Sequence, residues 1–151
     1  MISLVTIFCV LGLAFIIIWR ATRRRRADFD PIAHISDPRE AASVAMIAVA
    51  QANGPMSTAS RSAVVGQMQD HFCITADQAN ALMINAQMMV GEGVDAAEIM
   101  RRLLPVLQHN FSHAERQRFI EMLTAVANAD GQHDELATFD IYRLSRELGV
   151  A

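Results

Sequence analysis

Residues 48–54 of this chain read AVAQANG, and residues 125–131 read AVANADG. Each heptapeptide joins the end of an apolar segment to an Ala-(Asn/Asp)-Gly turn, and the same offset of 77 residues pairs Ser57 with Asp134 at the start of the next segment. The chain therefore contains two copies of an apolar helix, a short turn and a capped second helix. A duplicated helical hairpin predicts an all-α domain with pseudo-twofold symmetry, whose two apolar helices pack against each other.

Helix-start signals divide the rest of the domain into about six helices. Six short polar residues stand where an N-cap is expected: Asp37, Ser57, Thr75, Asp95, Ser112 and Asp134. Four of them have Gln or Glu three residues later. Asp37 combines this glutamate with a proline at the first helical position, and Thr75, Asp95 and Ser112 have the pattern of a capping box. The segment 38–53 is apolar on nearly all sides, which predicts a central, buried helix. Gly149 suits the end of the last helix, and Pro105 is expected to kink or shorten the helix 95–108.

The turn sequence resembles that of the tellurite-resistance TerB family, in which an Ala-x-Ala-Asp-Gly turn follows an apolar helix and acidic residues open the next helix. The related N-terminal domain of membrane-anchored DnaJ-like co-chaperones looks similar, and those proteins also begin with a membrane helix. The resemblance covers about residues 38–150 and implies a duplicated, all-helical domain. The chain contains no His-Pro-Asp tripeptide and no J domain, so we do not expect it to stimulate an Hsp70 chaperone itself.

The resemblance also implies a place for a metal ion, because acidic residues of both halves cluster in that family. The second half supplies four candidate ligands: Asp130, Asp134 and Glu135, with His133 beside them. The first half has Asn53 in place of the aspartate and no carboxylate among residues 57–60. Hard cations such as Ca²⁺ prefer six to eight oxygen ligands. Two interpretations therefore stay open: weak binding of a divalent cation, and plain turn-forming and helix-capping roles for these residues.

The N-terminal segment has the pattern of a membrane anchor. Residues 2–19 carry no charged side chain and end at Trp19, and a helix of this length spans about 27 Å, close to the thickness of the hydrocarbon core. Five arginines follow at once: Arg20, Arg23, Arg24, Arg25 and Arg26. The positive-inside rule then places the N-terminus outside and the domain in the cytoplasm. A cleaved signal peptide would carry its positive charge before the apolar run.

We therefore predict three parts: a transmembrane anchor at residues 1–22, a basic collar and linker at 23–36, and a TerB-like domain at 37–151. The protein would span the inner (plasma) membrane of a bacterium once, with the collar against the lipid bilayer and its anionic headgroups. From Asp28 onward, sixteen carboxylates against eight arginines leave a net charge of −8. This acidic domain argues against a nucleic-acid partner.

Sulfur-containing residues offer a weaker signal. Cys73 follows His71 without any further feature of a nucleophile, and we expect a small buried thiol. Met83, Met88 and Met89 stand close together, which fits either core packing or an adaptable surface for a partner.

The chain carries no nucleotide-binding loop, no Ser/His/Asp arrangement and no Cys-x-x-Cys pair, so we do not expect an enzyme or a certain cofactor. The sequence predicts a membrane-anchored adaptor or scaffold that presents an acidic, helix-lined surface to an unidentified protein partner. The resemblance implies a link to stress or to the tellurite and metal response. The alternatives are a domain that binds or senses a divalent metal, and a membrane-associated hydrolase with an unrecognised site. Self-association as a homo-oligomer, through the membrane helix or the methionines, is also open.

Overall fold

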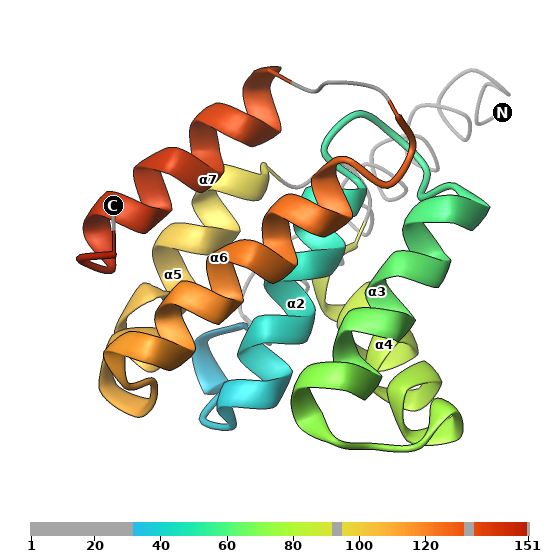
Figure 1. Cartoon of the computed structure of the whole chain (residues 1–151), viewed down its shortest axis with the longest axis horizontal. Coiled ribbons are helices and arrows are strands. Elements are labelled where there is room, and N and C mark those ends of the chain that lie inside the picture. The colour runs from blue at the N-terminus through green and yellow to red at the C-terminus, as the bar shows by residue number, and fades with distance from the viewer. Residues whose placement is uncertain (1–31, 92–94, 132–134, 151) are drawn as a thin grey trace, which may run out of the picture. The chain divides into compact units, whose positions relative to one another are not determined.

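A computed structural model describes residues 32–91, 95–131 and 135–150, the side chains of residues 135 and 136 excepted. This part of the chain contains one short 3-10 helix, six α-helices and no β-strand (Figure 1). The elements are η1 (Ile32–His34), α2 (Pro38–Ala50), α3 (Thr58–Phe72), α4 (Ala76–Val90), α5 (Ala96–Asn110), α6 (His113–Ala127) and α7 (Glu135–Glu147). The predicted all-α class and helix number are thus confirmed for the domain.

The predicted membrane helix at residues 1–22 lies outside the described residues. Within the described ranges, every helix falls short of the length and apolarity that crossing a bilayer requires.

Local capping chemistry explains where the helices begin. Asp37 accepts a hydrogen bond from the Arg39 backbone N–H at 2.8 Å, and Pro38 occupies the first helical position, where its missing N–H costs nothing. Thr75 and Ser112 form the predicted capping boxes, each exchanging two hydrogen bonds with the residue three positions on. At the other end of the chain, the Gly149 N–H donates to the Arg146 carbonyl and Gly149 adopts the left-handed conformation, which confirms its predicted role as the end of the last helix.

Helix α5 departs from the sequence predictions at two points. Asp95 caps it, but the Glu98 side chain pairs with Arg101 and Arg102 instead of returning to the cap, so the third capping box does not form. Of the two effects expected of Pro105, a kink or a shorter helix, the second does not occur, because the helix continues five residues further, to Asn110. Proline removes one backbone hydrogen bond. Apolar residues on either side of it, among them Leu103 and Leu107, are fully buried, and this packing holds the turn in place.

Helix α2 is the centre of the domain. Nine consecutive residues, 41–49, are buried, which is more than two turns and therefore every side of the helix. It contacts α3, α4, α5 and α6. Four of the nine buried residues are alanines, whose small side chains let neighbouring helices approach closely. The only hydroxyl group among the nine has a hydrogen-bond partner, because Ser43 Oγ donates to the Arg39 carbonyl at 2.7 Å. The prediction of a central, buried helix at this position is confirmed.

The duplication is visible in the backbone hydrogen bonds of the two turns. After α2, Gln51 donates to the Ile47 carbonyl, and at the same repeat position after α6, Asn128 donates to the Thr124 carbonyl. Two further pairs of bonds match at the same offset: Ala52 to Val49 with Ala129 to Val126, and Gly54 to Gln51 with Gly131 to Asn128. The two apolar helices, α2 and α6, also pack against each other as predicted.

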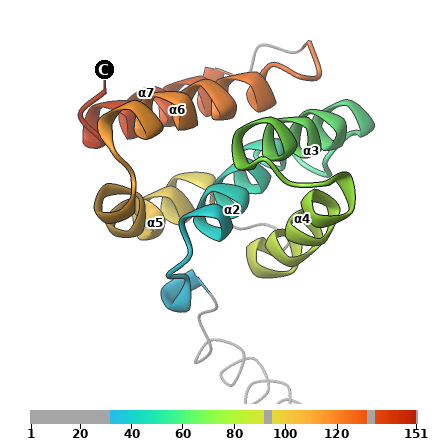
Figure 2. The ribbon, with the colours of Figure 1, turned by 60° about the horizontal axis from the view of Figure 1, so that its bottom comes forward.

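The two halves are nevertheless not equivalent in their surroundings. Helices α4 and α5, which lie between the two copies in sequence, pack on α2, whereas α6 and α7 lie side by side over α2 and α5 (Figure 2). Helix α3 contacts α6, while its counterpart α7 contacts α5. As a result Ala48 in α2 is 3% exposed, and Ala125, at the same repeat position in α6, is exposed.

The end of the predicted linker contributes to this core. Ile32 and Ile35 are buried, and η1 contacts α5. The compact unit of the chain accordingly begins at Ile32. The Ile35 N–H donates to the Ile32 carbonyl at 3.3 Å, which closes a single turn with a buried isoleucine at each end.

The contrast between Ala48 and Ala125 provides a matched test of the packing. Ala48→Leu adds bulk to a filled site, and we expect it to lower the free energy of unfolding by about 1–3 kcal/mol. Ala125→Leu makes the same change on an exposed surface and is expected to stay within about 0.5 kcal/mol. Urea unfolding followed by circular dichroism measures both. Equal losses in the two variants would contradict a core centred on α2 alone.

Candidate functional site

Asp130 connects the second repeated turn to the start of α3. Within the described residues, it carries the only carboxylate of that turn. Ser57 Oγ donates a hydrogen bond to Asp130 Oδ1, and Ser60 Oγ donates to Oδ2 at 2.8 Å. Ser57 is also the N-cap of α3, since its Oγ accepts from the Ser60 N–H at 3.0 Å. The acidic turn of one half therefore anchors the first turn of a helix in the other half.

The electrostatics of this contact favour a charged carboxylate. The hydrogen bonds from Ser57, the larger contribution, and from Ser60 hold the pKa of Asp130 below its usual value. The first half has no carboxylate at its corresponding positions, as the sequence showed, and its serines instead supply hydroxyl donors to the aspartate of the second half. Two neutral donors thus satisfy a charge that the family resemblance would have assigned to a cation.

The other predicted metal ligands are described only in part. His133 and Asp134 lie outside the described residues, and Glu135 is the first residue of α7, with its side chain not described. Among the residues that the structure does describe, no three His, Cys, Asp or Glu side chains are grouped so as to hold a metal ion. A metal site at Asp130, Asp134 and Glu135 stays a prediction.

Asn53 and Asp130, the equivalent residues of the two turns, line the same small cavity. Its volume is about 60 Å³, and Ser60 and the ends of α2 and α6 complete its wall. A polar cavity of this size has room for a water molecule or a small ion. The duplication thus brings together the two positions that the sequence comparison paired, although only one of them carries a charge.

The membrane-topology residues cannot be placed in the same way, because they all lie outside the described residues: Trp19, Arg20, Arg23, Arg24, Arg25 and Arg26. The anchor and its orientation stay predictions.

A surface that sequence reasoning missed lies on the outer face of α7. Phe139 is 62% exposed and Tyr142 58% exposed, and both line one surface depression together with Arg143, Arg146 and Glu147. We call these five residues the α7 outer face. The opposite side of the helix is buried through Ala137, Ile141, Leu144 and Leu148. The signal was present in the sequence, because Phe139 and Tyr142 fall between the positions of the buried stripe.

The methionines of α4 divide between core and surface, so both alternatives stay open, and the prediction of a buried Cys73 is wrong. Met83 is buried, as core packing requires, but Met88 is 71% exposed and lies beside the exposed Ile84 one turn earlier on α4. Cys73 is exposed rather than buried. It follows the last residue of α3 in the left-handed conformation, with φ of 53°, at the point where the helix ends.

The six-helix fold, with two equivalent turns joined through an aspartate, defines a duplicated helical-hairpin domain. The sequence model of the family described as tellurite resistance protein TerB matches residues 39–151. The chain belongs to the TerB family, which confirms the predicted resemblance. No curated protein and no solved structure matches it significantly.

The Asp130 contact predicts a pH-dependent stability. Because the folded-state pKa is lowered, its contribution is present at neutral pH and lost as the pH falls through that pKa. We expect Asp130→Asn to lower the melting temperature at pH 7, and the difference from wild type to shrink below about pH 4, where the unfolded carboxyl is protonated too. Glu121→Gln, on exposed α6 surface, controls for the loss of one charge. A difference that stays constant down to pH 3 would refute this role.

The wild type and Asp130→Asn also distinguish a purely structural role of Asp130 from metal binding. If Asp130 acts only through the serines, millimolar Ca²⁺, Mg²⁺, Mn²⁺ or Zn²⁺ should produce no heat in calorimetry and no change in melting temperature. A stabilisation by one of these ions in the wild type that Asp130→Asn abolishes would instead establish the metal site.

Proposed function

We propose that this protein is a membrane-anchored adaptor whose TerB-type domain binds a protein partner at the cytoplasmic face of the inner membrane, without catalysing a reaction. The family match supports the domain type, and the family's name motivates a link to tellurite or related stress. The uncharged N-terminal segment and the arginines that follow it support the anchor and its orientation.

The observation that carries the adaptor function is the α7 outer face. Two residues with aromatic rings, both more than half exposed on one short helix, leave apolar surface in contact with water. Such surface does not stabilise a monomeric domain, and it is typical of a site that binds another molecule. Aromatic residues and arginine are also the residue types that dominate binding energy in protein interfaces.

The charges on this face indicate the chemistry of the partner. Arg143 forms an ion pair with Glu147 at 3.2 Å, whereas the guanidinium of Arg146 has no ion pair or hydrogen bond within the described part of the chain. The face is therefore apolar with a net positive charge, in contrast to the acidic surface that the composition suggested. It suits a partner segment that combines apolar side chains with a carboxylate.

The membrane anchor is tested by protease accessibility. We expect the bulk of the chain to resist protease added to intact spheroplasts and to be digested once the spheroplasts are lysed, because the domain would lie inside. A periplasmic protein digested in both samples shows that the protease is active. Digestion of the domain in intact spheroplasts would refute the proposed topology.

The adaptor function is tested by crosslinking in intact membranes. A photoreactive amino acid at Tyr142 should yield a specific crosslinked product, identified by mass spectrometry, whereas the same group at the exposed Gln117 of α6 should not. Adding Phe139→Ser and Arg146→Glu to the Tyr142 variant should abolish the product, since the partner loses its apolar contact and meets a like charge.

The outcomes of this experiment are distinct. A crosslink between two copies of the chain identifies the partner as a second protomer. Products that are the same from both positions, or that survive the added substitutions, would contradict a role for the α7 outer face.

A second candidate function, binding of a divalent cation, is favoured by one observation. The paired turns place Asn53 and Asp130 around a single polar cavity. The cation titrations described above decide between this function and a purely structural turn.

A further inference from the structure

A second exposed surface with apolar side chains lies on helix α4. Ile84 and Met88 are both more than half exposed, and Asp77 and Ala81 are exposed on the same helix. The four residues are separated by four, three and four positions, the spacing that places side chains along one line of a helix. We call these four residues the α4 outer face. The opposite side of the helix is buried through Ala79, Met83, Ala86 and Val90.

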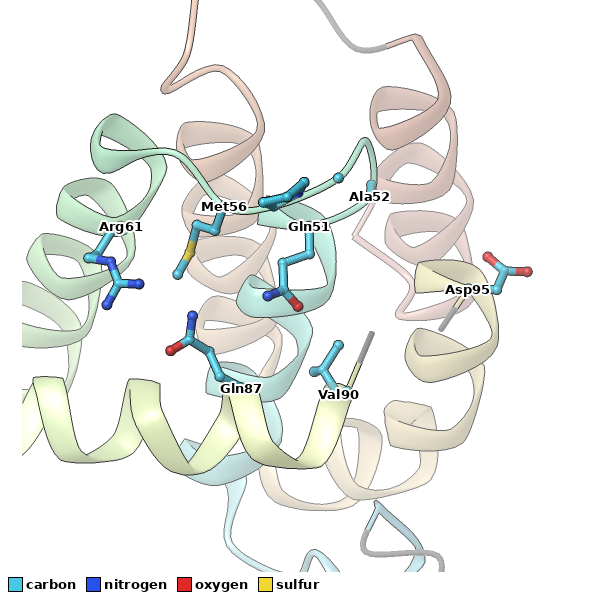
Figure 3. Close-up of a pocket in the computed structure, with 10 residues that line it drawn as sticks. Gln51, Ala52, Met56, Arg61, Gln87, Val90 and Asp95 are labelled. Atoms are coloured by element: carbon cyan, nitrogen blue, oxygen red, sulfur yellow. The ribbon is translucent and has the colours of Figure 1, made fainter. Parts of the chain in front are cut away.

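The α4 outer face and the α7 outer face belong to different sides of the domain. In both Figure 1 and Figure 2, α2 lies between α4 and α7. One domain therefore cannot bring its own two faces together, whereas the faces of two copies can meet. Helix α4 also lines a cavity through Gln87, together with Gln51 at the end of α2 and Arg61 of α3 (Figure 3). That cavity uses another side of α4, since no residue of the α4 outer face lines it.

The α4 outer face has the chemistry that suits the α7 outer face. Ile84 and Met88 supply apolar side chains, and Asp77 supplies a carboxylate. Within the described residues this carboxylate has no ion pair or hydrogen bond, and the same holds for the guanidinium of Arg146. Pairing each face with itself is less favourable, because two α7 outer faces repel through their net positive charge and two α4 outer faces leave Asp77 without a cation.

The spacing of the apolar and charged groups matches between the two faces. Phe139 and Arg146 are seven residues apart in α7, and Asp77 and Ile84 are seven residues apart in α4. Seven helical residues rise about 10.5 Å, so the two groups lie equally far apart along both helices. The apolar residue comes first in α7, whereas the charged residue comes first in α4. Both pairs therefore meet only when the helices run antiparallel, an orientation in which the helix dipoles also attract each other.

The sizes of the side chains are also complementary in this antiparallel arrangement. With Arg146 beside Asp77, Tyr142 comes opposite Ala81, because each lies four residues from its charged neighbour. A large side chain thus meets the smallest one of the other face, which lets two helices pack closely. Met88 comes next to Phe139, and a flexible thioether packs well against an aromatic ring.

We propose that the domain associates head to tail with further copies of itself, the α7 outer face of one copy packing on the α4 outer face of the next. This inference rests on the proposed function, because it names the partner of the α7 outer face. Since the two faces differ, every dimer keeps one face of each kind unoccupied and the assembly grows beyond two copies. A single pair of short helices buries less surface than a standard interface, so each contact is weak and assembly depends on concentration.

The first test locates the contact by crosslinking. In the full chain purified in detergent micelles, a photoreactive amino acid at Tyr142 should give dimers, trimers and larger species that increase with protein concentration. Mass spectrometry should place the crosslinked peptide of the second copy on α4. Ile84→Ser should remove these products through loss of the apolar contact, and it should leave the melting temperature unchanged because Ile84 is exposed.

The second test reverses the two charges and measures self-association by sedimentation velocity in the same micelles. Arg146→Glu and Asp77→Arg should each weaken association about tenfold, because like charges replace an ion pair. Glu121→Arg makes the same change of charge on exposed α6 and should have no effect. A mixture of Arg146→Glu chains with Asp77→Arg chains should associate as strongly as the wild type, because opposite charges meet again at every contact. Mixing cannot repair a folding defect, so this recovery is specific to the contact.

The outcomes separate this inference from the adaptor function. Crosslinks from Tyr142 to a different protein alone, in micelles and in intact membranes, would overturn head-to-tail assembly and leave the adaptor function standing. A crosslink between the α7 helices of two copies would also overturn it, as would a mixture that stays dissociated although both variants keep their helical circular dichroism. The absence of any specific product from Tyr142 would remove both proposals.

Discussion

The enclosure of α2 is the constraint on which the domain depends. A helix buried over more than two turns cannot be covered by one partner, and four other helices contact it. Its alanines set how closely these helices approach, so the positions of α3 to α6 follow from the side chains of one segment. Both polar regions described above begin at the end of this helix. The turn that follows α2 lines one cavity through Gln51, Ala52 and Gly54 (Figure 3) and lines a second, smaller cavity together with Asp130 through Asn53.

The two halves of the domain show how a duplicated backbone can diverge in chemistry. Their turns share three backbone hydrogen bonds at equivalent positions. The side chains on these turns differ, because Asn53 stands where the second copy has Asp130 and Ser57 stands where it has Asp134. Serine hydroxyls and an aspartate satisfy one another across the repeat, whereas two acidic turns would repel and would need a cation between them. The different residues of the first half therefore remove the need for a cation at this contact, while the backbone of the two turns stays the same.

The sequence was sufficient for features that depend on short-range chemistry. The helix starts at Asp37, Thr75 and Ser112 were predictable because a cap and the groups it bonds lie within three residues. The burial of α2 was predictable because no side of it is polar. The family was recognised from the turns themselves.

Features set by distant contacts were not predictable in this way. Pro105 stays within α5 because buried leucines hold the turns around it. Glu98 differs, because the groups that draw its carboxylate away from the cap are Arg101 and Arg102, only one turn further along the same helix. Asp130 was predicted as a ligand, but its contact with Ser57 and Ser60 joins residues more than seventy positions apart. The cavity at Gln51, Arg61 and Gln87 combines three segments that no local pattern connects.

The central position of α2 has a consequence for biosynthesis. This helix leaves the ribosome early, but its cover is complete only when α6, which ends at Ala127, has also emerged. Until then a nascent chain carries an apolar helix with too few neighbours to bury it, which is the condition under which chaperones bind and chains aggregate. Translation pauses that delay the emergence of α6 would prolong this exposed state.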